Sequence, residues 1–333
     1  MTELMTRPNC VASRVSKTSD SLDRAFAEGL TGHVITARDG KRVTLADGSD
    51  AVEFVSCSYL GLESHPPDLI AAATEAMNRF GLHFSTSRNR GRPPYLAELE
   101  ELLSVMYGGA QVAAFTSVSN VHLGLLPLLG AGALPSYPVS EAGVTFLVEK
   151  TAHASIQVIR GVLDQIGPTQ RFDMTDPFFA LPEAVAQAAA TGRTPIVLVD
   201  GVGSMGGLID VASMLAILEP VGGILYADDA HGVSIEGPLG AGYAFEALGG
   251  VLPSNVVLAG SLSKAFGGAG GFAVVPSEDD MRVLRKFANR WSSGIRSCCR
   301  CSRRTSRPPG CMLTARWPSC RRSSGTTRPS SIG

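Results

Sequence analysis

The sequence predicts an α/β fold in which helices cover both faces of a mostly parallel β-sheet. Two observations lead to this prediction. Between residues 56 and 294, short apolar runs alternate with stretches of helical periodicity, and polar residues directly follow several of the apolar runs. Because parallel sheets bind ligands at the carboxyl ends of their strands, these polar residues also indicate which wall of the molecule carries its chemistry.

Residues 1–55 precede this alternation, and we interpret them as an entry segment rather than a domain. An amphipathic stretch over Ser21–Leu30 predicts a helix, and the polar segment Ala37–Gly48 predicts a hairpin. Two Asp-Gly pairs in that segment are typical of turns, because glycine adopts the positive φ angles that tight turns require.

Six short apolar runs are expected to form the buried strands of the sheet. They are Val112–Phe115, Val144–Val148, Pro195–Val199, Gly223–Ala227, Val256–Ala259 and Gly271–Val275. Stretches of helical length lie among them, at Tyr95–Tyr107, Ser155–Gln165, Pro182–Ala190 and Ala212–Leu218. The alternation therefore defines one large domain over residues 56–294.

The composition of the 333 residues, 44% hydrophobic and 18% charged, is typical of a globular protein the size of an enzyme. No run approaches the roughly 18 apolar residues that a membrane helix needs. The first twenty residues also lack the apolar stretch of a signal peptide. We therefore expect a cytoplasmic protein with no membrane partner.

Residues 295–333 differ abruptly from the rest of the chain. They contain nine arginines, no lysine, no aspartate or glutamate, and five of the seven cysteines. Residues 1–294 are therefore acidic, although the formal net charge of the whole chain is −1. Three explanations of this tail stay open: a disordered basic segment that binds nucleic acid, a metal site built on its cysteines, or the product of a shifted reading frame.

A shifted reading frame is the explanation we favour for the tail. Metal sites normally space their ligands as Cys-x2-Cys pairs, whereas this tail carries a crowded Cys-Cys-Arg-Cys run. A basic tail also seldom carries five cysteines and a tryptophan. We expect no bound metal and no nucleic-acid partner. Only Cys10 and Cys57 precede the tail, so we expect no disulfide framework there.

A single lysine stands out just after the fifth expected strand. Lys264 is embedded in glycine, alanine and serine between Leu258 and Gly271. Small neighbours leave room beside the amine for a planar cofactor, and partial desolvation lowers the pKa of an amine toward the nucleophilic range. Because most lysines in glycine-rich loops are solvated surface groups, this signal needs support from other residues.

That support comes from an acidic motif 36 residues before the lysine. Asp228 and Asp229 follow the fourth expected strand, and His231 lies three residues after Asp228. The separation from Lys264 matches one βαβ unit, which places both motifs at neighbouring strand ends. Pyridoxal phosphate requires a carboxylate for its ring nitrogen, a histidine for its phenolic oxygen and a lysine for its aldehyde.

At residues 50–294 the chain resembles the α-oxoamine synthases, pyridoxal-phosphate enzymes of fold-type I that join an amino acid to an acyl-CoA. Its Asp-Asp-Ala-His-Gly motif resembles the family's Asp-Glu-Ala-His-Ser/Gly, which implies that Asp228 pairs with the ring nitrogen and His231 contacts the ring hydroxyl. The Ser-Leu-Ser-Lys segment resembles Thr-x-x-Lys. That match implies that Lys264 forms the Schiff base and that Ser261 binds the phosphate.

Three further segments carry the same resemblance. The run Thr-Ala-His-Ala-Ser resembles Asn-His-Ala-Ser, which implies that His153 stacks on the cofactor ring. The serine-rich segment after the first expected strand resembles the family's phosphate cup at a helix N-terminus, with Val118 and Ser119 at the cup positions. The run Asp-Gly-Val-Gly-Ser-Met-Gly-Gly resembles Glu-x-x-x-Ser-Met-Asp-Gly, which places Ser204 near the ring oxygen or the substrate.

Other parts of the resemblance concern the substrate. Ser58 stands where the family usually has the asparagine of Asn-Tyr-Leu-Gly-Leu, so a hydroxyl replaces an amide expected to help hold the substrate carboxylate. Arg88 belongs to a segment that reaches across the interface of a homodimer in the family. The family's small carboxyl-terminal domain supplies an arginine for the same carboxylate. It has no recognisable counterpart after Gly294, and we expect it to be missing or aberrant.

The resemblance implies a condensation of an amino acid with an acyl-CoA, with loss of CO2, to give an α-amino ketone. Lys264 would remove the α-proton of the amino acid while Asp228 keeps the ring nitrogen protonated. The implied partners are small-molecule substrates and a second copy of the chain. Transamination, amino-acid cleavage and an inactive cofactor-binding remnant stay open as alternatives. A serine acyl-enzyme pair of Ser261 and Lys264 is set aside, because the sequence has no Lys-Thr-Gly or Ser-Asp-Asn partner motif.

Overall fold

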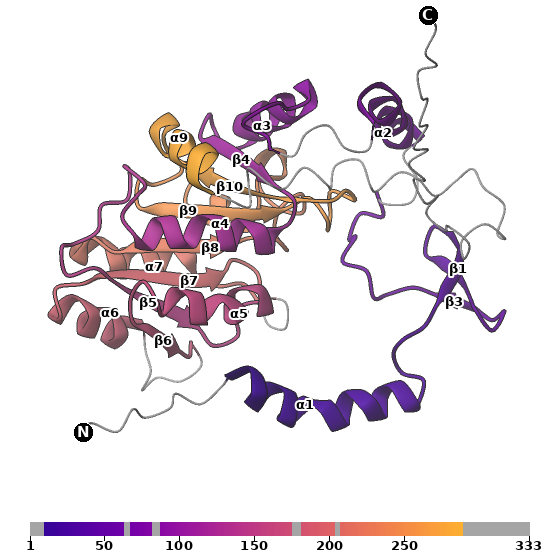
Figure 1. The fold of residues 1–333 in the computed structure, drawn as a ribbon, viewed down its shortest axis with the longest axis horizontal. Coiled ribbons are helices and arrows are strands. Elements are labelled where there is room, and N and C mark those ends of the chain that lie inside the picture. Colours follow the sequence, from indigo (N-terminus) through magenta and orange to yellow (C-terminus); the bar gives the residue numbers. More distant parts are fainter. Residues whose placement is uncertain (1–9, 63–66, 82–86, 175–180, 204–206, 289–333) are drawn as a thin grey trace, which may run out of the picture.

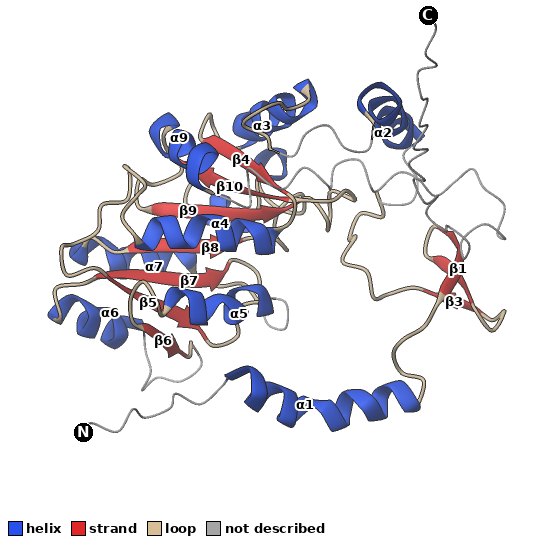
Figure 2. Ribbon diagram, in the orientation of Figure 1, coloured by secondary structure: helices blue, strands red, loops and turns tan. Residues whose placement is uncertain are grey.

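The computed structural model describes residues 10–62, 67–81, 87–174, 181–203 and 207–288. A seven-stranded sheet forms its centre, in the order β4-β10-β9-β8-β7-β5-β6 (Figures 1 and 2). Its strands are β4 (Gln111–Phe115), β5 (Val144–Glu149), β6 (Thr169–Phe172), β7 (Thr194–Asp200), β8 (Ile224–Asp228), β9 (Val256–Ser261) and β10 (Gly271–Val275). Strand β10 is antiparallel to both of its neighbours, and the other pairings are parallel.

The predicted mostly parallel sheet is confirmed, and each of the six predicted strands is present within a residue or two of its expected bounds. The sequence analysis missed β6, which pairs with β5 at the edge of the sheet. Its Thr-Gln-Arg-Phe sequence is polar and buries fully only Phe172. A short edge strand of this kind lacks the apolar run by which buried strands are recognised.

Helices cover both faces of the sheet, as the sequence predicts (Figure 2). The four predicted helices correspond to α3 (Pro94–Met106), α5 (Ala154–Leu163), α6 (Leu181–Ala190) and α7 (Val211–Leu218). The sequence analysis gave no bounds for α2 (Pro67–Phe80), α4 (Val118–Gly130), α8 (Tyr243–Ala247) and α9 (Glu278–Phe287), or for the short 3-10 turns Glu219–Val221 and Pro238–Gly240.

Two apolar cores lie on opposite faces of the sheet. Helices α4, α5 and α9 pack on one face, and α3, α6, α7 and α8 pack on the other. Successive strand residues alternate between the cores, as the pleat of a strand requires. In β8, for example, Tyr226 joins the core under α4, whereas Leu225 and Ala227 join the opposite core. This alternation decides toward which helices each polar residue at a strand end points.

The amino-terminal elements stand apart from the large sheet in Figure 1. They are α1 (Cys10–Ala27), a small antiparallel sheet of β1 (Ile35–Asp39), β2 (Arg42–Leu45) and β3 (Asp50–Val52), and α2. The predicted hairpin is confirmed, and the glycine of each Asp-Gly pair has a positive φ, +57° at Gly40 and +85° at Gly48. The helix predicted over Ser21–Leu30 is present, but it begins at Cys10 and ends at Ala27.

No helix in the described ranges combines the length and the apolar character that a membrane crossing requires.

Candidate functional site

Polar side chains gather at the carboxyl edge of the sheet, where the sequence analysis placed the chemistry. Strand β7 ends at Asp200, β8 at Asp228 and β9 at Ser261. The three strands are parallel neighbours, with Asp200 directly beside Asp228 and Asp228 beside Ala259. The predicted polar wall is therefore confirmed as a continuous row of strand ends.

Lys264 lies in the turn between β9 and β10, at this same edge. Backbone hydrogen bonds close the turn, from the Leu262 N–H to the Gly270 carbonyl (3.0 Å) and from the Gly268 N–H to the Leu262 carbonyl (2.9 Å). Burial lowers the pKa of the half-buried Lys264, although the carboxylates of Asp228 and Asp200 act in the opposite direction. A lowered pKa raises the fraction of neutral, nucleophilic amine at neutral pH.

Asp228 is a buried carboxylate, with 4% of its surface exposed. The backbone N–H of Ala230 donates to Oδ1 at 3.1 Å, and Nε2 of His122 lies 3.2 Å from Oδ2. Burial alone would raise the pKa of Asp228. The contact with His122, the charge of Lys264 and the Ala230 N–H outweigh burial and hold this pKa below its ordinary value. Asp228 is therefore ionised at neutral pH.

His231 lies in the turn after β8 and faces a residue that follows the small amino-terminal sheet. Its Nδ1 contacts the hydroxyl of Tyr59, and the two rings are tilted by 53° with centroids 6.0 Å apart. Burial and the positive charge of Lys264 lower the pKa of His231 to about 4. The imidazole is therefore neutral at pH 7. Tyr59 was not among the site residues predicted from the sequence, although the adjacent Ser58 was.

His153 caps the amino terminus of α5, directly after β5. Its backbone N–H donates to the carboxylate of Asp200 at 3.2 and 3.1 Å, while its Nδ1 accepts from the Ser155 N–H at 3.2 Å. Burial lowers the pKa of His153, so its ring also tends to be neutral. Burial and the charge of Asp228 raise the pKa of Asp200 to about 7. These shared interactions place His153, His231, Asp228 and Lys264 in one site.

The amino terminus of α4 lies at the same edge of the sheet. Helix α4 begins at Val118, and the hydroxyl of the preceding Ser117 accepts from the Asn120 N–H at 3.2 Å. The first N–H groups of a helix have no partner within it, so those of Val118 and Ser119 suit a phosphate. A Cβ at Gly271 would lie 2.5 Å from the Val118 nitrogen, so glycine is required where β10 passes this turn.

The remaining predicted site residues make contacts within the chain. The Oγ of Ser261 accepts from the Ser263 N–H at 3.1 Å. The Oγ of Ser58 accepts from Nζ of Lys41 at 2.9 Å, and Arg88 is buried and donates to the carbonyl of Ala114. Ser204 and the arginine-rich tail lie outside the described residues.

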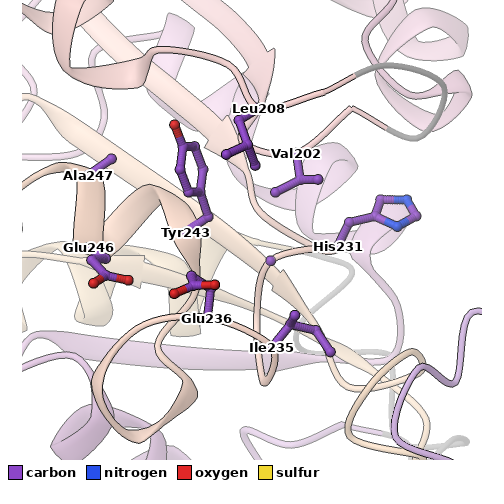
Figure 3. A pocket seen from close by; sticks show the side chains of 9 residues that line it. Val202, Leu208, His231, Ile235, Glu236, Tyr243, Glu246 and Ala247 are labelled. Carbon is purple, nitrogen blue, oxygen red and sulfur yellow. The ribbon is translucent and has the colours of Figure 1, made fainter.

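A pocket of about 450 Å³ opens beside His231. Figure 3 shows His231 at one end of the pocket and Glu246 with Ala247 at the other. Val202 and Leu208 from the segment after β7 also line it, and its lining is mainly apolar. This space adjoins the site and has the dimensions of a small-molecule pocket. No group of three or more potential metal-ligating side chains occurs in the part of the chain that the structure describes.

Comparison with known proteins shows the family to which the chain is related. The aminotransferase class I and II family model matches residues 49–304. An 8-amino-7-oxononanoate synthase of Geobacter metallireducens is 31% identical over 301 residues, which are 89% of this chain and 70% of that protein. The 2-amino-3-ketobutyrate coenzyme A ligase of Escherichia coli K12 is 30% identical over 276 residues, or 80% of this chain and 65% of the ligase.

Solved structures show the same fold at lower sequence identity. A serine palmitoyltransferase from S. paucimobilis, described with a bound PLP–myriocin aldimine, superposes with a TM-score of 0.69 at 22% identity. The match covers 87% of this chain and 72% of that one. A Sphingomonas wittichii serine palmitoyltransferase gives the same TM-score and identity over 87% of this chain and 71% of its own.

The mostly parallel sheet, with a lysine just beyond the end of β9 and a buried acid at the end of β8, defines a fold-type I scaffold for pyridoxal phosphate. The chain belongs to the aminotransferase class I and II family, and within it to the α-oxoamine synthases. It spans 65% of the length of an 8-amino-7-oxononanoate synthase from Geobacter sulfurreducens, to which it is 32% identical over 286 residues.

The residues present fit the cofactor of this family. Lys264 offers a half-buried amine of lowered pKa, and Asp228 offers a buried, ionised carboxylate for a protonated ring nitrogen. The first turn of α4 offers backbone N–H groups for a phosphate, and the glycine at position 271 allows β10 to pass close to that turn. The donors and acceptors that pyridoxal phosphate needs are therefore present along one edge of the sheet.

Proposed function

We propose that this chain binds pyridoxal 5′-phosphate and condenses an amino acid with an acyl-CoA. The products would be CoA, CO2 and an α-amino ketone. The observation that carries this proposal is the neighbouring pair of a lysine with lowered pKa and an ionised, buried aspartate in a chain of the α-oxoamine synthase family. The similarity to an 8-amino-7-oxononanoate synthase and to a 2-amino-3-ketobutyrate coenzyme A ligase supports the reaction class.

The cofactor contacts are assigned by chemistry and position. Lys264 forms the Schiff base, and Asp228 holds the proton on the ring nitrogen. His231, with a neutral ring, contacts the ring hydroxyl, and His153 stacks on the ring. The phosphate is bound by the first turn of α4 and by the hydroxyl of Ser261, which lies at the end of β9. Ser204 is assigned to the ring oxygen or the substrate from its motif alone.

Bound pyridoxal phosphate supplies an electron sink for the carbanion that forms at the α-carbon of the amino acid. Lys264 would take up the α-proton after the amino group of the substrate has displaced it from the cofactor, since burial lowers the pKa of its amine and so favours the neutral form. The carboxylate of Asp228 keeps a proton at the ring nitrogen, and its own low pKa makes it the anionic partner.

Substrate recognition and assembly form the second part of the proposal. Ser58 and Arg88 contribute to binding the substrate, and the chain forms a homodimer. Exposed apolar side chains of the entry segment support a partner surface, because Phe54 and Val55 are each 89% exposed in the single chain. We also propose a cytoplasmic location.

An assay with purified protein, pyridoxal phosphate, an amino acid and an acyl-CoA tests the reaction class. We expect release of free CoA only when both substrates are present, in a one-to-one ratio with CO2. Formation of a keto acid without CoA release would indicate transamination instead. Binding of the cofactor without any turnover would indicate an inactive remnant.

A further inference from the structure

A buried polar chain joins Asp228 to two residues that the proposed chemistry does not use. His122 on α4 and Tyr226 on β8 are both 0% exposed. The Nδ1 of His122 lies 2.6 Å from the hydroxyl oxygen of Tyr226, and its Nε2 lies 3.2 Å from Oδ2 of Asp228. The two rings meet near edge to face, with centroids 5.6 Å apart at 68°. Three polar groups thus line up at the margin of an apolar core.

The geometry of β8 and α4 explains this alignment. Tyr226 and Asp228 are two residues apart on a strand, so their side chains point to the same face of the sheet. Helix α4 covers that face. His122 lies four residues after Val118, about one turn further along the same side of α4. One helix therefore presents its amino terminus to the proposed phosphate position and its histidine to the acid.

The phenol of Tyr226 sets the direction of the hydrogen bonds. Burial raises the pKa of Tyr226 well above its ordinary value, and the charge of Asp228 raises it further, so the hydroxyl keeps its proton. A phenol that donates to Nδ1 leaves the ring proton of His122 on Nε2. Among the described residues Nε2 has no aligned hydrogen-bond acceptor, and the carboxylate of Asp228 is the group it approaches.

We propose that Tyr226 and His122 are positioning residues for Asp228. The phenol fixes the tautomer of the imidazole, and the imidazole N–H keeps the carboxylate ionised and oriented toward the ring nitrogen of the bound cofactor. This inference rests on the proposed pairing of Asp228 with that nitrogen. Lys264, Asp200, His153 and His231 act on Asp228 from the open site, whereas the Tyr226–His122 pair acts on it from the core.

The variant Tyr226→Phe tests this inference with the smallest change, since it removes one oxygen atom from a fully buried ring. Tyr137→Phe is a matched control. Tyr137 is also fully buried in the same core, and its hydroxyl donates to the Val256 carbonyl at 2.7 Å, at the start of β9. Both variants lose a buried hydrogen bond, but only the first loses a contact to His122.

The first readout uses the protein without cofactor. In 15N-labelled wild type, the His122 resonances should show protonated Nε2 and unprotonated Nδ1. Tyr226→Phe should give a mixture of tautomers, because nothing then donates to Nδ1 in its place. Tyr137→Phe should keep the wild-type pattern.

The second readout uses bound pyridoxal phosphate. We expect Tyr226→Phe to raise the cofactor's dissociation constant about tenfold. At metal sites, removal of a residue that orients a ligand weakens binding at least this much. The pH midpoint of the cofactor's absorbance should move by about one unit, equivalent to tenfold in a protonation equilibrium. Tyr137→Phe should leave both values unchanged. His122→Gln, which retains an N–H donor, should lie closer to wild type than His122→Phe.

The outcomes separate this inference from the function on which it rests. If Asp228→Asn leaves cofactor affinity and spectrum unchanged, the pairing of Asp228 with the ring nitrogen is wrong. If Asp228→Asn alters both while Tyr226→Phe and His122→Phe behave like Tyr137→Phe, the pairing stands and the positioning inference is overturned.

Discussion

The two acids of the Asp-Asp pair have opposite environments, because adjacent strand-end residues point to opposite sides of the sheet. Asp228 faces His122 and is ionised. Asp229 accepts from the Ala244 N–H at 2.9 Å, but its Oδ1 has no hydrogen-bond partner among the described residues. Burial raises the pKa of Asp229 to about 7. Asp228 therefore suits a positively charged partner, whereas Asp229 is about half protonated at pH 7.

Titration of Asp229 should therefore lower the stability of the cofactor-free protein as the pH rises from about 4 to about 7, whereas His231, whose pKa is lowered to about 4, contributes in the opposite direction. A carboxyl whose pKa is raised by folding binds its proton more tightly in the folded state, so its contribution is complete below pH 4 and lost above pH 7. The shift of Asp229 from 3.8 to about 7 corresponds to at most about 4 kcal/mol. Denaturant unfolding at several pH values measures the slope.

The variant Asp229→Asn should remove this downward contribution to the pH dependence, because the amide cannot ionise. Part of the slope should remain, since burial also raises the pKa of Asp200 to about 7. Asp23→Asn, at an exposed position of α1, serves as the control and should keep the wild-type slope. An Asp229→Asn protein with the same slope as wild type would show that Asp229 does not titrate in this range.

Residue types at strand ends were predictable from the sequence, whereas their partners were not. Lys264, Asp228 and His231 carry recognisable motifs. His122 lies within an apolar helix and Tyr226 within an apolar strand, so the local sequence predicts only that each is a core residue. They meet across 104 residues of sequence, and Tyr59 meets His231 across 172. Contacts between residues so far apart in sequence depend on how the helices pack on the sheet, and local sequence patterns do not encode that packing.

Helix α4 is the element on which both ends of the proposed cofactor site depend. Its first turn touches the start of β10, where Gly271 pairs with Phe115 on one side and Ser261 on the other. A Cβ at Gly271 would lie 2.5 Å from the Val118 nitrogen and 2.7 Å from the Ser117 carbonyl carbon. These are backbone atoms, so a larger residue must displace the start of the helix or the strand.

Gly271→Ala should therefore weaken pyridoxal phosphate binding and lower the free energy of unfolding by about 1–3 kcal/mol, as expected for overpacking. Gly161→Ala is the matched control. It lies within α5, and a Cβ there meets no atom within 4 Å. The control should be neutral or more stable by up to about 1 kcal/mol. Fluorescence of bound cofactor measures the affinity, and urea unfolding measures the stability. Equal affinity and stability of the Gly271→Ala and Gly161→Ala proteins would contradict the close approach of Gly271 to the first turn of α4.

Most elements of the sheet were predictable because their apolar runs are short, bounded and regularly spaced. The antiparallel direction of β10 was not assigned, since an apolar run gives no direction. The connection from β9 to β10 spans only Leu262–Gly270, which suits antiparallel neighbours rather than a crossover helix. Loop length would have been the usable signal. For α4, the run Val118–Gly130 is apolar on most sides, so helical periodicity is weak there.

At the scale of the whole molecule, the amino-terminal elements carry large apolar side chains that are exposed to solvent in the single chain. Phe26 on α1 is 67% exposed and Phe54 after β3 is 89% exposed. Tyr59, which follows β3 in the chain, contacts His231. A partner subunit would cover this surface and complete the surroundings of the site.

Sedimentation should therefore show a dimer of the wild-type chain, and Phe54→Asp should shift it toward the monomer. The charge would oppose burial of that position in an interface. Val251→Asp is the control, since Val251 is 69% exposed and lies on the loop before β9. A Phe54→Asp protein that sediments with the same mass as the control would place the interface elsewhere.

The covalent bond between Lys264 and the cofactor is the most direct test of the proposed function. Protein incubated with pyridoxal phosphate is reduced with borohydride, digested, and analysed by mass spectrometry. We expect one phosphopyridoxyl group, on the peptide that contains Lys264, and a near-visible absorbance band that Lys264→Ala abolishes. Lys150→Ala, which removes a more exposed lysine paired with Asp173, should retain both signals. Labelling of another lysine, or an absorbance band that persists in Lys264→Ala, would contradict the assignment of the Schiff base to Lys264.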